Sequence, residues 1–290
     1  MRKNRKITKA VFPVAGFGTR FLPATKASPK EMLPIVDKPL IQYAVEEAID
    51  AGITDMIFIT GKNKRSIEDH FDVAYELESD LHTKNKHKLL ETIRNIIPKH
   101  INCIYIRQTE MLGLGHAVLC AKPIINNEPF AVLLADELID SKIGSLKQMM
   151  NLYQEVNTSI LGVHSVFKAD VSNYGIVKVR NNNKGDLVDF IIEKPKQNEA
   201  PSNLAVIGRY ILMPEIINHL ECTKNGVGGE IQLTDAISSL LEEQEIYAHT
   251  IEGVRYDCGS KLGYLKATVM YGLKHKELSD QFMEFIKAIK

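Results

Sequence analysis

Cysteine is scarce in this sequence, and neither sign of charge is in excess. The 290 residues include four cysteines, which lie far apart and form no C-x-x-C pair. Neither a zinc site nor a disulfide framework is therefore indicated. Scattered thiols are typical of the reducing cytosol, so we expect a cytoplasmic protein. Lysine plus arginine number 36, as do aspartate plus glutamate, which leaves no basic excess for a nucleic-acid partner.

Long apolar runs, linkers, repeats and low-complexity tracts are also missing. No stretch approaches the roughly 18 apolar residues of a membrane span, so no membrane partner is expected. With 44% hydrophobic and 25% charged residues, the composition is that of a globular protein. We predict one continuous domain over residues 1–290, with a first half at about 6–157, a second at about 158–274 and a C-terminal helix at 275–290.

Apolar strands and helices alternate through the first half. Residues 56–60 and 130–136 read as buried strands, whereas 40–52 and 145–156 have helical apolar spacing. This alternation predicts an α/β fold with a Rossmann-like, mostly parallel mixed sheet and helices on both faces. Residues 75–100 are polar and predict one or two exposed helices.

Beyond residue 157 the rhythm changes to strands with few helices between them. Strands are expected at 159–166, 174–179, 187–193 and 204–212, and helices at 229–242 and 262–273. The sequence NNNK at 181–184 predicts a hairpin turn. The second half is therefore expected to add a smaller antiparallel part to the sheet.

The first expected strand runs into a glycine-rich loop. The apolar run AVFPVA ends at Gly16, and Gly18, Arg20 and Lys30 follow. Glycine turns expose backbone N–H groups that can hold an anion, and the two cations would add fixed charge at a phosphoryl group. The chain has no Walker A string, and Phe21 stands where a dinucleotide fingerprint needs its third glycine. On these residues alone, a glycine turn without a ligand remains the alternative.

A longer string around the loop favours the nucleotide interpretation. AGFGTRFLPATKASPKEMLPIVDKPLIQY, residues 15–43, resembles the signature loop of the sugar-1-phosphate nucleotidylyltransferases nearly residue for residue. The resemblance extends from Lys6 to about Lys274, and GFGTRFLP and GLGHAV are similar to the uridylyl-transferring branch. It implies the nucleotide-diphospho-sugar transferase fold, with a nucleotide-binding first half and a sugar-binding second half. It also implies an enzyme that makes UDP-glucose and pyrophosphate from UTP and α-D-glucose 1-phosphate, with Mg²⁺ as cofactor. Relatives are commonly dimers or tetramers, so a homodimer or homotetramer is expected.

The resemblance implies two metal-binding carboxylates. Asp136 ends an apolar strand, and Asp257 stands in the string RYDCGSKLG. Mg²⁺ prefers one or two carboxylates together with phosphate oxygens. From position alone, Asp136 could equally cap a helix, and Asp257 could be a solvated residue at a helix start. Glu137 takes the place of a second acidic residue, often Asp, in relatives, and we expect it to support the site rather than bind the metal.

The remaining roles implied by the resemblance fall on matched strings. Arg20, Lys30 and Lys194 would be catalytic by holding phosphates. The nucleotide would contact Ala15, Gly16, Gly18, Thr19, Gln108 and Gly113, with the Gln108 amide pairing with the imide edge of uracil. The sugar would contact Gly175, Glu193, Val206, Gly208 and Glu230, and Arg209 is expected in the same pocket. Without the resemblance, QTEMLGLGHAV is a glycine-rich helix start and IIEKP an exposed Glu–Lys pair.

Three other functions stay open at this point. A thymidylyltransferase, or an enzyme for another sugar, would share the fold, and nucleotide competition separates it from the uridylyl reading. A regulator that binds sugar nucleotides without catalysis would bind but not turn over. A dinucleotide-dependent oxidoreductase is disfavoured by Phe21.

Overall fold

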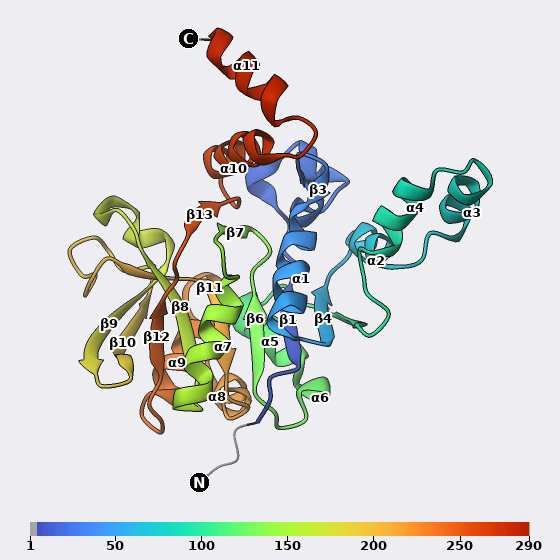
Figure 1. The fold of residues 1–290 in the computed structure, drawn as a ribbon. Helices are drawn as coiled ribbons and strands as arrows, with labels where there is room; N and C mark the ends of the chain where they lie inside the picture. Colours follow the sequence, from blue (N-terminus) through green and yellow to red (C-terminus); the bar gives the residue numbers. More distant parts are fainter. Residues whose placement is uncertain (1–4, 290) are drawn as a thin grey trace.

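A nine-stranded mixed sheet forms the centre of the computed structural model, which describes residues 5–289 (Figure 1). The strand order is β5-β4-β1-β6-β11-β8-β12-β10-β9. The strands are β1 Lys9–Pro13, β4 Asp55–Thr60, β5 Asn102–Arg107, β6 Phe130–Leu133, β8 Ile160–Ser165, β9 Gly175–Asn182, β10 Gly185–Glu193, β11 Leu204–Leu212 and β12 Tyr247–Thr250. Strands β5, β4, β1 and β6 are parallel, and β11 runs antiparallel to β6, β8 and β9. The predicted mixed α/β fold is confirmed, and the antiparallel strands extend the same sheet.

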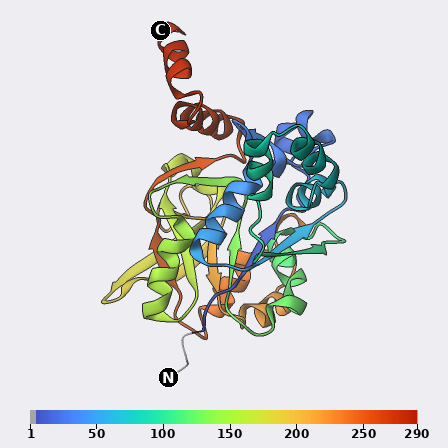
Figure 2. The same ribbon diagram turned by 45° about the vertical axis from the view of Figure 1, so that its right-hand side comes forward.

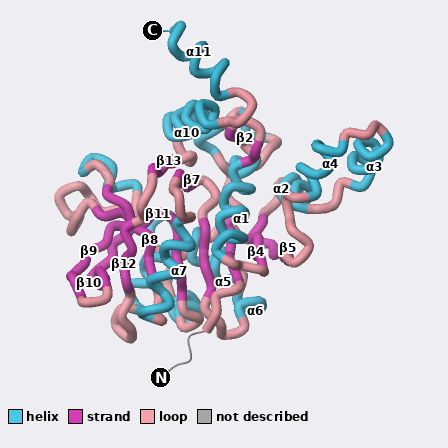
Figure 3. Tube along the Cα trace, viewed as in Figure 1, coloured by secondary structure: helices cyan, strands magenta, loops and turns pink. Residues whose placement is uncertain are grey.

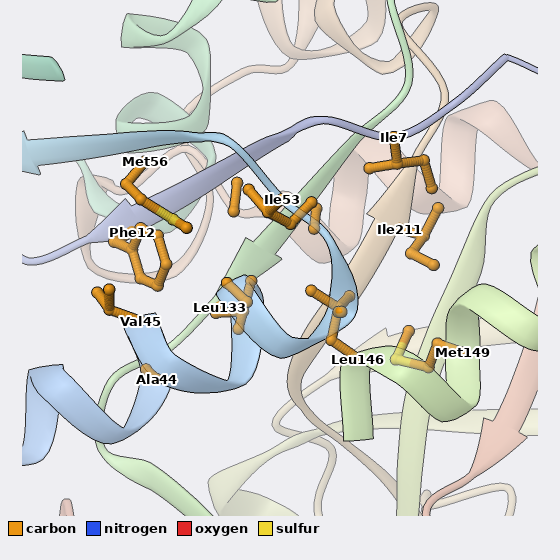
Figure 4. Close-up of a cluster of buried hydrophobic side chains, with 14 of the residues drawn as sticks. Ile7, Phe12, Ala44, Val45, Ile53, Met56, Leu133, Leu146, Met149 and Ile211 are labelled. Atoms are coloured by element: carbon orange, nitrogen blue, oxygen red, sulfur yellow. The ribbon is translucent and has the colours of Figure 1, made fainter. Parts of the chain in front are cut away.

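Helices cover both faces of the sheet because successive strand residues point to opposite sides. In β1, Phe12 packs into one apolar cluster and Val11 into the other. The first cluster contains residues of α1 (Leu40–Ala51) and α7 (Ser145–Val156), and Figure 4 shows its side chains meeting between these helices and the strands. The second contains residues of α5 (Gly113–Cys120), α8 (Ile216–Cys222) and α9 (Leu233–Leu240), with the short α6 (Lys122–Ile125) beside them.

Two helices, α3 (Tyr75–Thr83) and α4 (His87–Arg94), form an arm that stands away from the sheet (Figures 1 and 3). The preceding α2 (Arg65–Phe71) packs Ile67 and Phe71 into the first apolar cluster. Helices α3 and α4 bury one residue each, Leu81 and Leu90. The prediction of exposed helices at 75–100 is therefore confirmed.

Two small sheets and two helices lie beyond the carboxyl ends of the parallel strands. The sheets pair β7 (Glu137–Asp140) with β13 (Val254–Asp257), and β2 (Pro34–Ile35) with β3 (Lys38–Pro39). Helices α10 (Lys261–Lys274) and α11 (Ser279–Ile289) project from this end in both ribbon views (Figures 1 and 2). Within residues 5–289, no helix is both long and apolar enough to cross a bilayer.

Several predicted boundaries were wrong, and two of them bear on the site. The strand expected at 130–136 ends at Leu133, and the next residues form a connection that leads into β7. The helix expected at 229–242 is α9, which begins only at Leu233. Gly228 and Gly229 have φ of +75° and +76°, which an α-helix does not accommodate, and they form part of the 3₁₀ turn Val227–Gly229.

Candidate active site

Four loops meet at one edge of the parallel part of the sheet. The glycine loop follows β1, residues 61–64 follow β4, Gln108 follows β5, and residues 134–136 follow β6. Because the four strands are parallel neighbours, their carboxyl ends lie together. Ligands of open parallel sheets bind at this edge. The sequence predicted candidate residues in three of these loops and missed the one at 61–64.

A cavity of about 490 Å³ opens at this edge. Nine of the predicted site residues line it: Arg20, Asp136, Gly175, Glu193, Lys194, Val206, Gly208, Glu230 and Asp257. Residues predicted for phosphate, metal and sugar thus surround one space, although they come from the two halves of the chain.

Lys30 and Asp136 form an ion pair at this cavity. The Lys30 Nζ and Asp136 Oδ2 atoms are 2.6 Å apart. Burial alone would lower the pKa of Lys30, but the Asp136 carboxylate raises it above its usual value. Burial would likewise raise the pKa of Asp136, and the Lys30 ammonium holds it below its usual value. Both groups are therefore charged at neutral pH. A second cation, Arg20, reaches the same space, with Nη1 3.5 Å from the carbonyl oxygen of Gly259.

The glycine loop is shaped to bring Lys30 close. Gly18 has φ +66°, and a β-carbon there would lie 3.2 Å from Lys30 Cβ. The Thr25 hydroxyl donates a 2.7 Å hydrogen bond to the Gly18 carbonyl, which closes the loop. The short 3₁₀ helix Lys30–Met32 is anchored by a buried ion pair, at 2.8 Å, between its own Glu31 and Lys64 of the loop after β4.

The other face of the loop borders a second cavity of about 340 Å³. Three predicted nucleotide contacts, Ala15, Gly16 and Thr19, line it together with residues 62–64. The segment at 61–64 approaches the loop closely, since a β-carbon at Gly61 would lie 3.1 Å from the carbonyl oxygen of Ala15. The sequence GKNK, a glycine followed by two lysines after a buried strand, was the signal that could have identified this loop.

The β7–β13 sheet brings the two predicted metal ligands together. Asp257 stands opposite Glu137 in this antiparallel pair, and the Cys258 N–H donates to the Asp136 carbonyl at 2.8 Å. A β-carbon on Gly259 would lie 2.8 Å from Asp136 Oδ2 and 3.0 Å from Asp257 Oδ1. The two carboxylates thus converge on a space that is open because residue 259 is glycine.

Two carboxylates that face one space are donors suited to a divalent cation, and in this structure Asp136 Oδ2 accepts from the Lys30 ammonium and Asp257 Oδ1 from the Gly259 N–H. Mg²⁺ is bound through one or two carboxylates and completes its shell with water and substrate phosphates. In the part of the chain that the structure describes, no group of three or more His, Cys, Asp or Glu side chains could hold a metal by itself. A cation between Asp136 and Asp257 would therefore need oxygens from a substrate or from water.

Glu137 points into a separate network that the sequence did not predict. Arg255 donates two 2.6 Å hydrogen bonds to the Glu137 carboxylate, and its Cζ lies 4.7 Å from the centroid of the Tyr174 ring. The Tyr174 hydroxyl in turn donates to Asp257 Oδ2 at 3.2 Å. Burial raises the pKa of Glu137 to about 7 despite Arg255, and the neighbouring Asp136 and Asp257 charges act in the same direction as burial. Through the Tyr174 hydroxyl, this network helps to hold the Asp257 carboxylate in position.

Glu193 and Lys194 lie at the end of β10 and line the same cavity as Arg20 and Asp136. Thr234 at the start of α9 donates a 2.5 Å hydrogen bond to Glu193 Oε2, and Lys194 Nζ is 3.4 Å from Oε1. Gly175 pairs with Glu193 across the strands, and a β-carbon there would lie 3.2 Å from Glu193 Oε2. The Glu193 carboxylate is thus held in place while it faces the cavity.

Gln108 and Gly113 contact each other beside the cavity. The Gln108 side-chain amide donates to the Gly113 carbonyl at 3.1 Å and shares a 3.0 Å hydrogen bond with His116 Nδ1. Gly113 has φ +92°, and a β-carbon there would lie 2.7 Å from Glu230 Cβ. This close approach joins the Gln108 segment to the Glu230 segment.

Arg209 is not where the sequence placed it. Its side chain is 1% exposed and lies behind residues 134–137 instead of facing the sugar side of the cavity. The reason is local. A register shift in β11 between Val206 and Tyr210 redirects the intervening residues, and a charged guanidinium then finds a buried carboxylate, Glu47.

Comparisons with known proteins agree with this geometry. The family model described as "Nucleotidyl transferase" matches residues 9–272. A UTP–glucose-1-phosphate uridylyltransferase of Staphylococcus epidermidis is 51% identical over 287 residues, which cover 98% of this chain and 99% of that protein. Among solved structures, a UTP-bound UGPase from Acinetobacter baumannii superposes with a TM-score of 0.91 at 45% identity, covering 98% of this chain and all of that one. A UDP-glucose pyrophosphorylase complexed with UDP-glucose gives 0.86 at 50% identity, covering 93% of this chain and all of that one.

Proposed function

The chain belongs to the nucleotidyl transferase family, and from this premise we propose that it transfers the uridylyl group of UTP to α-D-glucose 1-phosphate. A phosphate oxygen of glucose 1-phosphate forms a bond to the α-phosphorus of UTP. The bond from that phosphorus to pyrophosphate breaks, and its electron pair leaves with pyrophosphate. The products are UDP-glucose and pyrophosphate. The observation that carries the proposal is one cavity lined both by Asp136 and Arg20 of the first half and by Glu193 and Lys194 of the second.

This reaction needs no side-chain nucleophile. It needs two anions held in line and the developing charge neutralised. Arg20 and Lys30 bind the triphosphate and the leaving pyrophosphate, and Lys194 steadies the phosphate of the incoming sugar. The fixed charges of Lys30 and Arg20 at the cavity edge support these roles, because preorganised cations are the strongest stabilisers of transferring phosphoryl groups.

Enzymes of this family generally use a divalent metal. We propose Mg²⁺, held by Asp136 and Asp257. When bound, the ion would supply positive charge that neutralises phosphate oxygens. Glu137 stays a supporting residue through Arg255 and Tyr174.

Base and sugar recognition fall on neighbouring segments, which meet where Gly113 approaches Glu230. Gln108 and Gly113 bind uracil, and the backbone of Ala15, Gly16, Gly18 and Thr19 lies along the nucleotide. Gly175, Glu193, Val206, Gly208 and Glu230 bind the sugar, with Glu193 accepting hydrogen bonds from its hydroxyls. The close approach of the Gln108 and Glu230 segments supports one continuous site for both parts of the product.

We also propose that the protein works as a homodimer or homotetramer in the cytoplasm. Helix α11 buries no residue, and it exposes Met283, Phe285 and Ile289, a surface that a second copy could cover. Light scattering of the purified chain tests this, and a single-chain mass at micromolar concentration would contradict it.

Pyrophosphate release tests the reaction. UTP is mixed with a panel of sugar 1-phosphates, with Mg²⁺ or EDTA, and dTTP replaces UTP in a parallel series. The expected result is fast, metal-dependent release with UTP and glucose 1-phosphate. Faster release with dTTP or with another sugar 1-phosphate would overturn the substrate assignment. UDP-glucose binding without release from any pair would make the protein a binding module.

A further inference from the structure

A buried ion pair lies directly behind the loop that carries Asp136. Arg209 of β11 is 1% exposed, and its Nη2 and Nε atoms lie 2.9 and 3.1 Å from the two carboxylate oxygens of Glu47 in α1. Taking two charges out of water is costly, and an apolar pair of similar volume is often as stable. The pair therefore needs an explanation other than packing.

The Arg209 guanidinium spans the segment that contains Asp136. Its Nη1 donates to the Leu134 carbonyl at 2.9 Å, and its Nη2 donates to the Glu137 carbonyl at 2.9 Å. These two carbonyls flank Asp136 along the chain. The backbone on both sides of the predicted metal ligand is thus held by one side chain.

We call the Arg209–Glu47 pair, which holds residues 134–137, the clamp. Glu47 connects the clamp to a second helix, α7. Its Oε1 atom accepts a 2.5 Å hydrogen bond from the Ser145 hydroxyl and a 2.8 Å hydrogen bond from the Leu146 N–H, both in the first turn of α7. The Asp136 loop is therefore fixed to α1, α7 and β11 through one hydrogen-bonded pair.

Two glycines make room for this arrangement. At Gly208, φ is +69°, and its carbonyl accepts from the Leu134 N–H at 2.9 Å. At Gly162 in β8, a β-carbon would lie 2.9 Å from Arg209 Cβ. Any larger residue at either position would push Arg209 or the loop aside.

We propose that Arg209 and Glu47 are positioning residues for the uridylyl transfer, holding residues 134–137 so that the Asp136 carboxylate is presented to the metal. This inference rests on the proposed function. Arginine is required because its planar fork donates to Leu134, Glu137 and Glu47 at once, whereas a lysine ammonium is a single point charge.

The test is Arg209→Lys, which keeps the charge but not the fork. UDP-glucose binding is measured by calorimetry with Mg²⁺ and with EDTA, beside kcat and KM. We expect metal-free affinity and both KM values within about threefold of wild type. The gain in affinity with Mg²⁺, and kcat, should fall about 10–100-fold, as is usual when partners of metal ligands are altered.

The matched control is Leu240→Ala, which opens the second apolar cluster under α9, on the opposite face of the sheet from α1 and α7. It should lower the melting temperature at least as much as Arg209→Lys while leaving kcat and the Mg²⁺-dependent affinity within twofold. A purely structural role for Arg209 would make the two variants behave alike, and that result would overturn the proposal.

If Arg209→Lys does not fold, Ser145→Ala tests the positioning role of the Arg209–Glu47 pair. It removes the hydroxyl that anchors Glu47, so we expect a smaller loss of kcat and Mg²⁺-dependent affinity, about threefold to tenfold. Wild-type values would overturn the clamp. The proposed function fails separately, because it requires pyrophosphate release from the wild-type chain itself.

Discussion

Lys30 and Asp136 hold opposite charges 2.6 Å apart at the cavity, so each is kept ionised by the other. Lys30→Ala removes a fixed cation from the phosphates, and Asp136→Asn removes a charged metal ligand while keeping the shape. We expect each change to lower kcat at least about 100-fold, because such electrostatic groups contribute several kcal/mol to the transition state. Steady-state pyrophosphate release measures the loss.

The chain supplies a matched control for these variants. Lys38 and Glu46 form another 2.6 Å ion pair, which is somewhat more exposed and lies outside the residues that line the cavity. Lys38→Ala should leave kcat within about twofold. Near-normal turnover by Lys30→Ala or Asp136→Asn, at an unchanged melting temperature, would contradict their assignment.

Glu193 provides a second test at the residue scale, because its carboxylate is fixed by Thr234 and faces the cavity. Glu193→Gln keeps the size but loses the charge that strengthens hydrogen bonds to sugar hydroxyls. We expect KM for glucose 1-phosphate to rise about tenfold, which corresponds to the roughly 1–3 kcal/mol of a charge-assisted bond. KM for UTP should stay within twofold. Asp189→Asn, on the same strand but paired with Arg180 at the surface, is the control. Equal rises in both KM values would place Glu193 outside the sugar site.

Single residues show where sequence reasoning succeeds and where it stops. The location of Asp136 and the glycine loop after buried strands was predictable because a carboxylate or a glycine at the end of an apolar run is a local pattern. Arg209 was misplaced because its orientation depends on a partner, Glu47, 162 positions away in the chain. An arginine inside the apolar run AVIGRYIL was a signal for a buried ion pair, but nothing local identifies the partner.

At the scale of elements, the register shift of β11 between Val206 and Tyr210 shapes the site more than the regular part of the strand does. Gly208 has φ +69°, and a β-carbon there would lie 2.6 Å from Leu134 Cδ1. Gly208→Ala therefore meets both backbone strain and overpacking. We expect a loss of about 2–4 kcal/mol in the free energy of unfolding, measured by urea titration.

Gly16→Ala is the control for this prediction. Gly16 also belongs to the site, but a β-carbon there would have no atom within 4 Å, and its φ lies outside the left-handed region. Its free energy of unfolding should change by less than about 1 kcal/mol. Similar values for the two variants would mean that the β11 irregularity adapts to a side chain.

Most elements were predictable because their patterns are local and strong. Helices α1 and α7 have an apolar stripe, and β11 is a buried run that is apolar apart from Gly208 and Arg209. The errors occurred where a contact outside the element sets the boundary. Strand β6 ends at Leu133 although the apolar run continues, because Gly208 and Arg209 take over the backbone hydrogen bonds of Leu134.

For the whole molecule, the sequence predicted a mixed sheet with an antiparallel part but could not give the strand order. Strand β11 separates β6 from β8, and so inserts a strand of the second half between two strands that precede it in the chain. That insertion is what places Gly208 and Val206 on the same cavity as Asp136. Register and strand order depend on pairings between distant segments, which no local period encodes.

The buried Glu47–Arg209 pair also sets how the whole molecule responds to acid. Burial alone would raise the pKa of Glu47, but Arg209 and the Ser145 and Leu146 hydrogen bonds hold it below the usual value of 4.5. A depressed pKa contributes stability that is present above pH 4.5 and is lost as the pH falls through the folded-state value. Glu47→Gln should lower the free energy of unfolding at pH 7 by about 3–5 kcal/mol, because Arg209 stays buried without its counter-charge.

The same substitution should flatten the acid limb of the stability curve. Urea titrations at about pH 7, 5, 4 and 3.5 should show a smaller decline in the free energy of unfolding below pH 4.5 for Glu47→Gln than for wild type. Glu46→Gln, one residue away and paired with Lys38 at the surface, controls for the loss of a carboxylate as such. Parallel wild-type and Glu47→Gln curves would mean that other carboxylates govern acid unfolding. If the wild-type and Glu47→Gln curves instead converge at low pH, a large part of the acid sensitivity lies at the Glu47–Arg209 ion pair behind Asp136. The fold and the candidate site would then lose their order together.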